Sequence, residues 1–342
     1  MDIRLIVAIS AGLIFSTTHN LFSAVDPLYQ RFQFIEPHLG TLVDLTLYAS
    51  SEAVANDAAQ AAFARIKELN RIFSDYTSDS EASRLCITAG SGARVPVSDE
   101  LFELLSQSEA ISEATGGAFD VTIGPVAKLW RVARRQRRLP PQEPLDTARE
   151  LVGWTNVQLQ QESQTVQLLK RGMQLDFGGI AKGYIAQQTR DVLARCGISR
   201  CLVSIAGDIC AGDSPPDSDG WKIGIAPLID PNGPPTYFLR LENCSVSTSG
   251  DAFQFVQIDG IRYSHIVNPS SGLGLTYRSS VTVVASDGAT ADGFATAITV
   301  LGVEKGLRVV EPFKDVAALM VLNVEQGLSI HETRNFKEWL IP

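Results

Sequence analysis

The sequence predicts an α+β, or mixed α/β, fold in which helices pack on mixed, largely antiparallel sheets. Segments with strand and helix patterns alternate along the 342 residues, and hairpin signals are frequent. The strongest hairpin signal is Asp259-Gly260, a dipeptide that favours tight turns, between two apolar runs. With 45% hydrophobic residues, the chain can bury the substantial core of a globular protein.

In the first half of the chain, apolar residues at alternate or helical spacing predict strands and helices. Residues 25–37 are interpreted as a polar leader, and residues 38–342 as a single domain. The elements expected are a strand at 41–49, a helix at 52–73, a polar turn at 78–83, a helix capped by Ser98 that ends near Ala114, a short apolar segment at 124–130, a short helix at 145–152, and a hairpin of 157–159 with 166–169.

The second half begins with a strand end, a turn with two glycines, and a helix at 180–196 with Gly197 after its last residue. The same patterns predict the remaining elements. They are strands at 201–205, 221–225, 237–241, 245–247, 253–258 and 261–265, a strand at 280–285, a helix at 289–301 closed by Gly302, and strands at 317–322 and near Ser329.

Residues 1–24 resemble a secretory signal. A single early Arg4 precedes an apolar run, and small residues favour cleavage after Ala24. The run is too short to span a bilayer comfortably. An uncleaved anchor that associates with the membrane is the alternative, since Asp2 offsets Arg4. Either reading predicts an exported protein that is periplasmic, or bound to the inner membrane on its periplasmic side.

The net charge of -9 argues against a nucleic-acid surface, because such a surface is basic. One basic run, residues 131–138, contains five arginines. We interpret it as a solvated helix end and loop; contact with an anionic ligand or a membrane is the alternative.

Five cysteines and four histidines show no spacing typical of zinc sites. We expect the cysteines to be small buried residues, and a disulfide is the alternative in an exported protein. Their odd number leaves at least one thiol unpaired.

The turn in residues 174–184 combines Asp176, Gly178, Gly179 and Lys182. Glycines let backbone approach a ligand closely, and the next helix directs free N–H groups into the turn. A phosphate is the natural occupant. The alternative is a tight strand-to-helix connection with a satisfied aspartate and a solvated lysine.

Asp292 and Thr296 lie four residues apart in a predicted helix, and therefore on one face. Their oxygens suit Mg²⁺, whereas the alternative is an aspartate in the first helical turn that interacts with the macrodipole. His265, before a turn at Asn268-Pro269, could act as a general base, or simply hydrogen-bond the turn. Residues 206–208 and 247–251 place hydroxyls, glycines and acids at strand ends, as ligand sites or as capped turns.

Other common signatures are missing from the sequence. It has no Rossmann or P-loop fingerprint, and no G-x-S-x-G motif of a serine triad. A nucleotide would therefore have to be held in another way.

Taken in order, the motifs resemble the ApbE family of FAD:protein FMN transferases, from about residue 38 to the C-terminus. The similar stretches are L-G-T (39–41), F-S-D-Y-T-S-D-S-E-A-S-R-L (73–85), G-G-A-F-D-V-T-I-G-P (116–125), L-D-F-G-G-I-A-K-G-Y (175–184), A-G-D-I (206–209), S-T-S-G-D (247–251), H-I-V-N-P-S-S-G (265–272) and T-A-D-G-F-A-T-A (290–297).

The resemblance implies a T-fold-like core and Mg²⁺-dependent transfer of FMN from FAD to a Thr or Ser hydroxyl of an acceptor flavoprotein, with release of AMP. It implies that His265 activates the acceptor hydroxyl. Metal ligands would be Gly179, Asp292 and Thr296. The FAD site would be lined by Leu39, Tyr76, Ala118, Phe119, Asp120, Asp176, Lys182 and Ile266.

The chain departs from the family pattern at Leu39, Cys86, Asn268 and Gly293, which stand where Met, Asn, Asp and Ala are usual. Two alternatives to the transferase follow. One is an FAD pyrophosphatase that forms FMN and AMP with water, and the other is an FAD-binding protein without turnover.

Overall fold

The computed structural model describes residues 29–342. The predicted signal peptide or anchor, residues 1–24, lies outside the described residues. Within them, no helix combines the length and the apolar character needed to cross a membrane.

An eight-stranded sheet forms the centre of the fold, and each strand runs antiparallel to its neighbours. This confirms the α+β fold with largely antiparallel sheets, since every strand pair that the central sheet forms within residues 29–342 is antiparallel. In spatial order its strands are β1 (Gln30–His38), β2 (Thr41–Ala49), β6 (Cys201–Ile205), β7 (Asp208–Ala211), β10 (Ser245–Gly250), β13 (Ser279–Ala285), β14 (Ala317–Val324) and β15 (Gly327–Glu332).

Three small sheets surround the central one. In the hairpin of β11 and β12, both turn residues have positive φ, 48° at Asp259 and 80° at Gly260, as the sequence predicts. In one small sheet, β5 (Thr165–Leu168) lies between β3 (Val95–Pro96) and β4 (Val157–Gln160). The other two sheets pair β8 (Trp221–Ile225) with β9 (Tyr237–Leu241), and β11 (Phe255–Ile258) with β12 (Ile261–Ser264).

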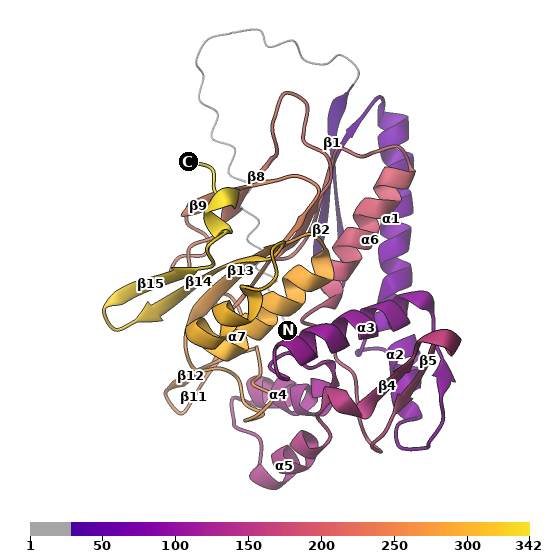
Figure 1. Ribbon diagram of the computed structural model, residues 1–342, viewed down its shortest axis with the longest axis vertical. Coiled ribbons are helices and arrows are strands. Elements are labelled where there is room, and N and C mark those ends of the chain that lie inside the picture. Colours follow the sequence, from indigo (N-terminus) through magenta and orange to yellow (C-terminus); the bar gives the residue numbers. More distant parts are fainter. Residues whose placement is uncertain (1–28) are drawn as a thin grey trace.

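Three long helices cover one face of the central sheet (Figure 1). They are α1 (Glu52–Phe73), α6 (Ala181–Arg195) and α7 (Gly288–Val310). The other helices are α2 (Glu81–Ile87), α3 (Asp99–Ala114), α4 (Gly124–Gln136) and α5 (Gln142–Glu150), with short 3₁₀ turns at η1 (Val121–Ile123), η2 (Trp154–Asn156), η3 (Gln161–Ser163) and η4 (Phe336–Trp339).

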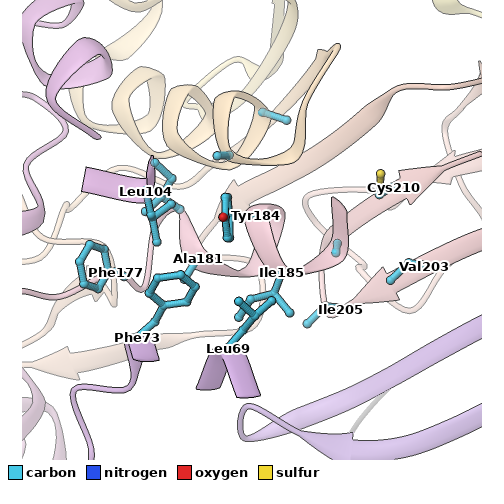
Figure 2. Packing of buried hydrophobic residues seen from close by; sticks show 14 of the residues in the cluster. Leu69, Phe73, Leu104, Phe177, Ala181, Tyr184, Ile185, Val203, Ile205 and Cys210 are labelled. Atoms are coloured by element: carbon cyan, nitrogen blue, oxygen red, sulfur yellow. The ribbon is translucent and has the colours of Figure 1, made fainter. Parts of the chain in front are cut away.

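The main core lies between this sheet face and the three helices. Figure 2 shows Phe73 of α1, Tyr184 and Ile185 of α6, and Val203 and Ile205 of β6 converging there. Alternate residues of a strand point to opposite faces, so the sheet builds a second core on its other side. This second core includes residues of β8, β9 and η4.

Several local structures differ from the sequence prediction. Residues 30–37, which the sequence predicts as part of a leader, belong to β1, and this strand pairs along its whole length with β2. The polar turn at 78–83 contains the start of α2, which Ser80 caps by accepting a hydrogen bond from the Ser83 amide. The segment at 124–130 continues as α4 to Gln136. The backbone leaves helical geometry at Gly302, as predicted, but α7 resumes after it.

All five cysteines are free thiols. Cys201, Cys210 and Cys244 are buried, as expected of small core residues, whereas Cys86 is half-buried and Cys196 is exposed, so the expectation is wrong for Cys196.

Candidate functional site

A polar cluster lies where the helix side of the sheet meets the N-terminal halves of α6 and α7. Its sheet part comes from Asp208, the first residue of β7, and Ser247 of β10, which are paired in register. The Ser247 hydroxyl donates a hydrogen bond to Asp208 Oδ1. Asp208 is 2% exposed, so its carboxylate needs a partner of opposite charge.

Lys182, in the first turn of α6, is that partner. Its Nζ lies 2.6 Å from Asp208 Oδ2 and 3.5 Å from Asp292 Oδ2 on α7. The Gly183 amide also donates to Asp292 Oδ2, at 3.3 Å. Asp292 therefore interacts with both a lysine and the N-terminus of α6, where negative charge is stabilised.

Two glycines allow this contact between the helices. A Cβ on Gly183 would lie 2.0 Å from the carbonyl oxygen of Gly288, and one on Gly288 would lie equally close to that of Gly183. No real Cβ is tolerated so near a backbone oxygen, so the close approach of α6 and α7 depends on both glycines.

Gly179, in the turn before α6, acts in a similar way. Thr296 Oγ1 lies 3.4 Å from the Gly179 carbonyl oxygen, and a Cβ on Gly179 would be 2.9 Å from that hydroxyl. Ser249 Oγ of β10 also lies 3.4 Å from Thr296 Oγ1. The structure therefore brings the predicted metal ligands Gly179, Asp292 and Thr296 to one place.

The donor set fits a hard divalent cation, because it offers a carboxylate, a hydroxyl and a carbonyl oxygen. Within the described residues Asp292 makes its hydrogen bonds through Oδ2 alone, which leaves Oδ1 for a further ligand. No group of three His, Cys, Asp or Glu side chains in this part of the chain offers another metal site.

The electrostatics of the cluster reflect its burial. Burial and the neighbouring Asp208 raise the pKa of Asp292 to about 7, against the opposing effect of Lys182. For Lys182, burial alone would lower the pKa, but Asp208 and Asp292 raise it above its ordinary value. The lysine is therefore a permanent positive charge at neutral pH.

Asp292 does not lie in the first turn of its helix, which corrects the alternative interpretation. Asp287 is the N-cap, and its side chain accepts a hydrogen bond from the Thr290 amide at 2.8 Å. Asp292 is buried one turn later, where the macrodipole of its own helix does not account for it.

Asp176 lies beside the cluster and is held by Arg131 of α4. Arg131 Nη2 is 2.5 Å from Asp176 Oδ2, and its other terminal nitrogen binds Asp75. Asp176 Oδ1 accepts from the Gly178 amide at 2.8 Å. Burial raises the pKa of Asp176, although Arg131 opposes this. Arg131 also stacks over the Tyr76 ring, at 4.6 Å from its centroid.

The segment at 118–120 contributes mainly backbone. Phe119 belongs to the main core, and both Asp120 oxygens already accept hydrogen bonds inside the fold. One binds the Thr122 amide at 2.8 Å, and the other binds the Trp154 amide at 2.9 Å. Ala118 is half-buried in the turn before them.

Leu39 lies in the two-residue turn between β1 and β2, with φ of 54°. Since Val43 pairs with Ile205, this turn is at the same end of the sheet as Asp208. Ile266 is buried, and its amide donates to Ser264 Oγ at 3.0 Å.

His265 follows β12 and approaches the Gln254 carbonyl with Nδ1, at 3.2 Å. Because a carbonyl only accepts, Nδ1 carries the proton in this contact and Nε2 is left as a proton acceptor. Burial and the positive charge of Arg134 lower the pKa of His265 to about 4, and Lys182 contributes in the same direction.

Four residues in or beside the cluster were not assigned from sequence: Asp208, Ser247 and Ser249 in it, and Arg131 beside it. The motifs at 206–208 and 247–251 gave a signal for the first three, because they place acid and hydroxyl groups at strand ends. Arg131 was interpreted as solvated with the rest of its run, whereas it forms two ion pairs. Its partners Asp75 and Asp176 are far away in sequence, so no local pattern could reveal these ion pairs.

Known proteins share the sequence pattern and the fold of this chain. The model of the ApbE family matches residues 39–320, which is most of the chain. The chain belongs to the ApbE family. Among curated ApbE relatives, the FAD:protein FMN transferase of Treponema pallidum (strain Nichols) is 32% identical, over 86% of this chain and 84% of its own length. The enzyme of the same name from Vibrio cholerae is 29% identical over 89% of this chain and 91% of its own length.

Solved ApbE structures share the fold. The flavin transferase ApbE from Vibrio cholerae superposes with a TM-score of 0.80 at 28% identity, and covers 91% of this chain and 100% of its own. The apo form of the Pseudomonas stutzeri flavinyl transferase ApbE gives a TM-score of 0.78 at 30% identity, with 91% and 97% coverage. The ApbE-like fold predicted from sequence is therefore confirmed.

Proposed function

We propose that this chain transfers the FMN moiety of FAD, through a phosphoester bond, to a threonine or serine hydroxyl of an acceptor flavoprotein and releases AMP. One observation carries the proposal: the turn at Gly179 and Lys182 meets Asp292 and Thr296 across the α6–α7 contact. Membership of the ApbE family and the names of its relatives support the class of enzyme, a transferase.

Asp292, Thr296 and the Gly179 carbonyl would hold Mg²⁺. When bound, the ion neutralises negative charge on the pyrophosphate oxygens of FAD. Lys182 adds a fixed positive charge at the same place, held by Asp208. These residues together suit a diphosphate whose bridging bond is to be broken.

His265 has the state required of a base, because it is neutral at pH 7 and its Nε2 is free to accept a proton. In the proposed step the acceptor hydroxyl oxygen forms a bond to the FMN phosphorus while the bond from that phosphorus to the AMP phosphate oxygen breaks. The hydroxyl proton passes to Nε2 of His265, and AMP leaves with the bonding electrons.

The FAD site would extend from this cluster along Tyr76 and Asp176. The Tyr76 ring is 79% exposed, so one of its faces can stack on a flavin or adenine ring. Leu39, Ala118, Phe119, Asp120 and Ile266 would complete the site, with Phe119 and Asp120 acting through backbone because their side chains are engaged in the fold.

The test is incubation of the full chain with FAD, Mg²⁺ and a flavoprotein subunit that has an acceptor threonine. We expect a covalent FMN band by in-gel fluorescence and an equal amount of AMP by chromatography. Chelation of Mg²⁺ by EDTA should abolish both products, and added Mg²⁺ should restore them. AMP and free FMN without an acceptor would instead identify a pyrophosphatase, and FAD binding without AMP a non-catalytic protein.

Asp292→Asn and His265→Asn should each lower the transfer rate at least about a hundredfold, as is usual when a metal ligand or general base is removed. Glu304→Gln is the matched control for Asp292→Asn, since Glu304 lies on the same helix and its side chain is 83% exposed. Unchanged fluorescence in either site variant contradicts the roles assigned here.

We further propose that the chain acts outside the cytoplasm, on the basis of the signal pattern in residues 1–24. N-terminal sequencing of the protein recovered from cell fractions tests this. A periplasmic chain that begins at Val25 supports a cleaved signal, an intact membrane-bound chain supports the anchor, and a cytoplasmic chain contradicts export.

A further inference from the structure

A basic groove of about 1040 Å³ lies between α4 and β11, next to the proposed FAD site. The protein as a whole has a net charge of -9, yet Asp75 is the one carboxylate among the groove's lining residues. Five lining residues are cationic: Lys128, Arg131, Arg134, Arg135 and Arg137.

One lining residue of the groove, Arg134, is near His265 because of how α4 packs. Trp130 Nε1 donates to the Ser264 carbonyl at 3.0 Å, which fixes α4 against the residue before His265. Arg134 lies four residues after Trp130 and so on the same face of the helix. Its charge acts on the His265 imidazole. The positive charge of the groove therefore reaches the proposed base.

Most of these cations have no acidic partner. Arg131 binds Asp75 and Asp176, whereas no carboxylate of residues 29–342 forms an ion pair with the other four. The diphosphate of FAD does not account for them, since Lys182 and the Asp292 cluster are already assigned to it. They are available for the second substrate.

The shape of the groove suits a polypeptide. From Lys128 to Arg137 the cations extend over about 14 Å of helix, the length of about four residues of extended chain. An aromatic ring is accessible beside them, because Phe255 is 46% exposed. Arg262 stacks on Phe255, with its guanidinium carbon 3.3 Å from the ring centroid, and holds this ring in place.

We propose that the groove between α4 and β11 binds an acidic segment of the acceptor protein, adjacent to its modified hydroxyl residue, and aligns that hydroxyl with His265. This inference rests on the proposed transferase function. It assigns the basic run to recognition of the protein substrate by charge complementarity. A carboxylate bound at Arg134 would also offset the charge that lowers the pKa of His265, so docking would make the base stronger.

The test uses two synthetic peptides with the same central threonine, one flanked by aspartates and the other by asparagines. Arg135→Gln combined with Arg137→Gln removes two exposed groove charges, at residues that have no assigned role in the Asp292 cluster. The control variant combines Arg138→Gln with Arg308→Gln, which removes two positive charges that lie outside the groove. Binding of fluorescein-labelled peptide is measured by anisotropy, transfer by fluorescence of covalent FMN, and FAD affinity by quenching of flavin fluorescence.

We expect the wild type to bind the acidic peptide about tenfold more tightly than the neutral one at low ionic strength, and less selectively in high salt. The groove variant should lose this preference and keep its FAD affinity within about twofold, while the control variant keeps both.

Equal binding of the two peptides by the wild type overturns the proposal, as does a groove variant with weakened FAD binding and unchanged peptide binding. The second result would place the groove in the dinucleotide site. Because anisotropy does not require turnover, acidic-peptide binding without transfer would contradict the transferase function and leave the groove's selectivity established.

Discussion

At the residue scale, the charge state of His265 decides what it can do. Its ordinary pKa near 6.5 would leave part of the population protonated at neutral pH. Burial and Arg134 lower that pKa to about 4, so the imidazole is neutral and able to accept a proton throughout the physiological range. The same shift makes it a weak base in the free protein, and a partner that offsets Arg134 would strengthen it.

The pKa of His265 can be measured by NMR of the histidine ring carbons, with His265→Asn to assign the signal. We expect a titration midpoint near pH 4. Arg134→Gln should raise the midpoint, because the protonated ring then loses a repulsive neighbour, and Arg138→Gln should leave it unchanged. A midpoint near 6.5 in the wild type would contradict both causes.

Because the pKa of His265 is lowered in the folded protein, the free energy of unfolding depends on pH. Between about pH 6.5 and 4 the unfolded chain binds a proton at this residue that the folded chain does not bind. His265 therefore lowers the free energy of unfolding as pH falls through this window, and His265→Asn should make the decline less steep. Urea denaturation at several pH values measures it.

At the scale of elements, the site depends on how closely α6 approaches α7. Gly183 and Gly288 face each other there, and the distance between the helices allows Asp292 to contact both Lys182 and the Gly183 amide. The contact brings together a turn and a helix that are more than 100 residues apart in sequence. The geometry of the metal ligands is thus set by backbone packing.

Gly183→Ala should separate the helices. The new methyl group would lie 2.0 Å from the Gly288 carbonyl oxygen, which is backbone and cannot rotate away. We expect a loss of about 3 kcal/mol in the free energy of unfolding and little remaining transfer. Denaturation by urea and the FMN transfer assay measure the two effects.

Gly293→Ala is the matched control for this variant. Its methyl group would meet Ile111 Cδ1 at 2.5 Å, the end of a flexible side chain, and alanine is the better helix former. We expect its stability to stay within about 1 kcal/mol of the wild type. Equal loss in the two variants would contradict the importance of the Gly183–Gly288 contact.

Helices and strands whose apolar residues recur at a regular spacing could be predicted from sequence. Elements whose side chains are mostly exposed or half-buried could not. The helix at 52–73 buries a continuous apolar stripe, so its pattern is plain. Strand β1 is an edge strand whose side chains are exposed or half-buried, and it therefore resembled a polar leader. The start of α2 is polar, and its stabilising contacts include a hydrogen bond from Ser98 to Glu81, 17 residues away.

The residues of the site also divide into those that could be predicted from sequence and those that could not. Asp292, Thr296 and Lys182 could be predicted because each lies in a motif with its own local chemistry. Asp208 could be noted as an acid at a strand end, but its pairing with Lys182 depends on sheet register and on the position of α6. The role of Arg131 depends on two carboxylates, 56 and 45 residues away, that only the folded chain brings to it.

At the scale of the whole molecule, the central sheet separates two hydrophobic cores, and the proposed site lies on the side of only one of them. Its helix side carries the Asp292 cluster, and the opposite side packs against the β8–β9 hairpin and η4 (Figure 1). The chain end closes this second core, since the Ile341 amide donates to the Phe238 carbonyl at 2.8 Å. We therefore expect that a substitution in the second core lowers the free energy of unfolding without changing the transfer reaction on the other side of the sheet.

Phe336→Ala tests that separation. Phe336 of η4 is fully buried, so the variant should lose about 3–5 kcal/mol in the free energy of unfolding. The control Phe253→Ala removes a ring that is 60% exposed and should change stability by less than about 1 kcal/mol. Because Phe336 contacts none of the site residues, transfer per folded Phe336→Ala molecule should equal that of the wild type at low temperature. If transfer falls while circular dichroism shows a folded protein, the second core is coupled to the site through the sheet.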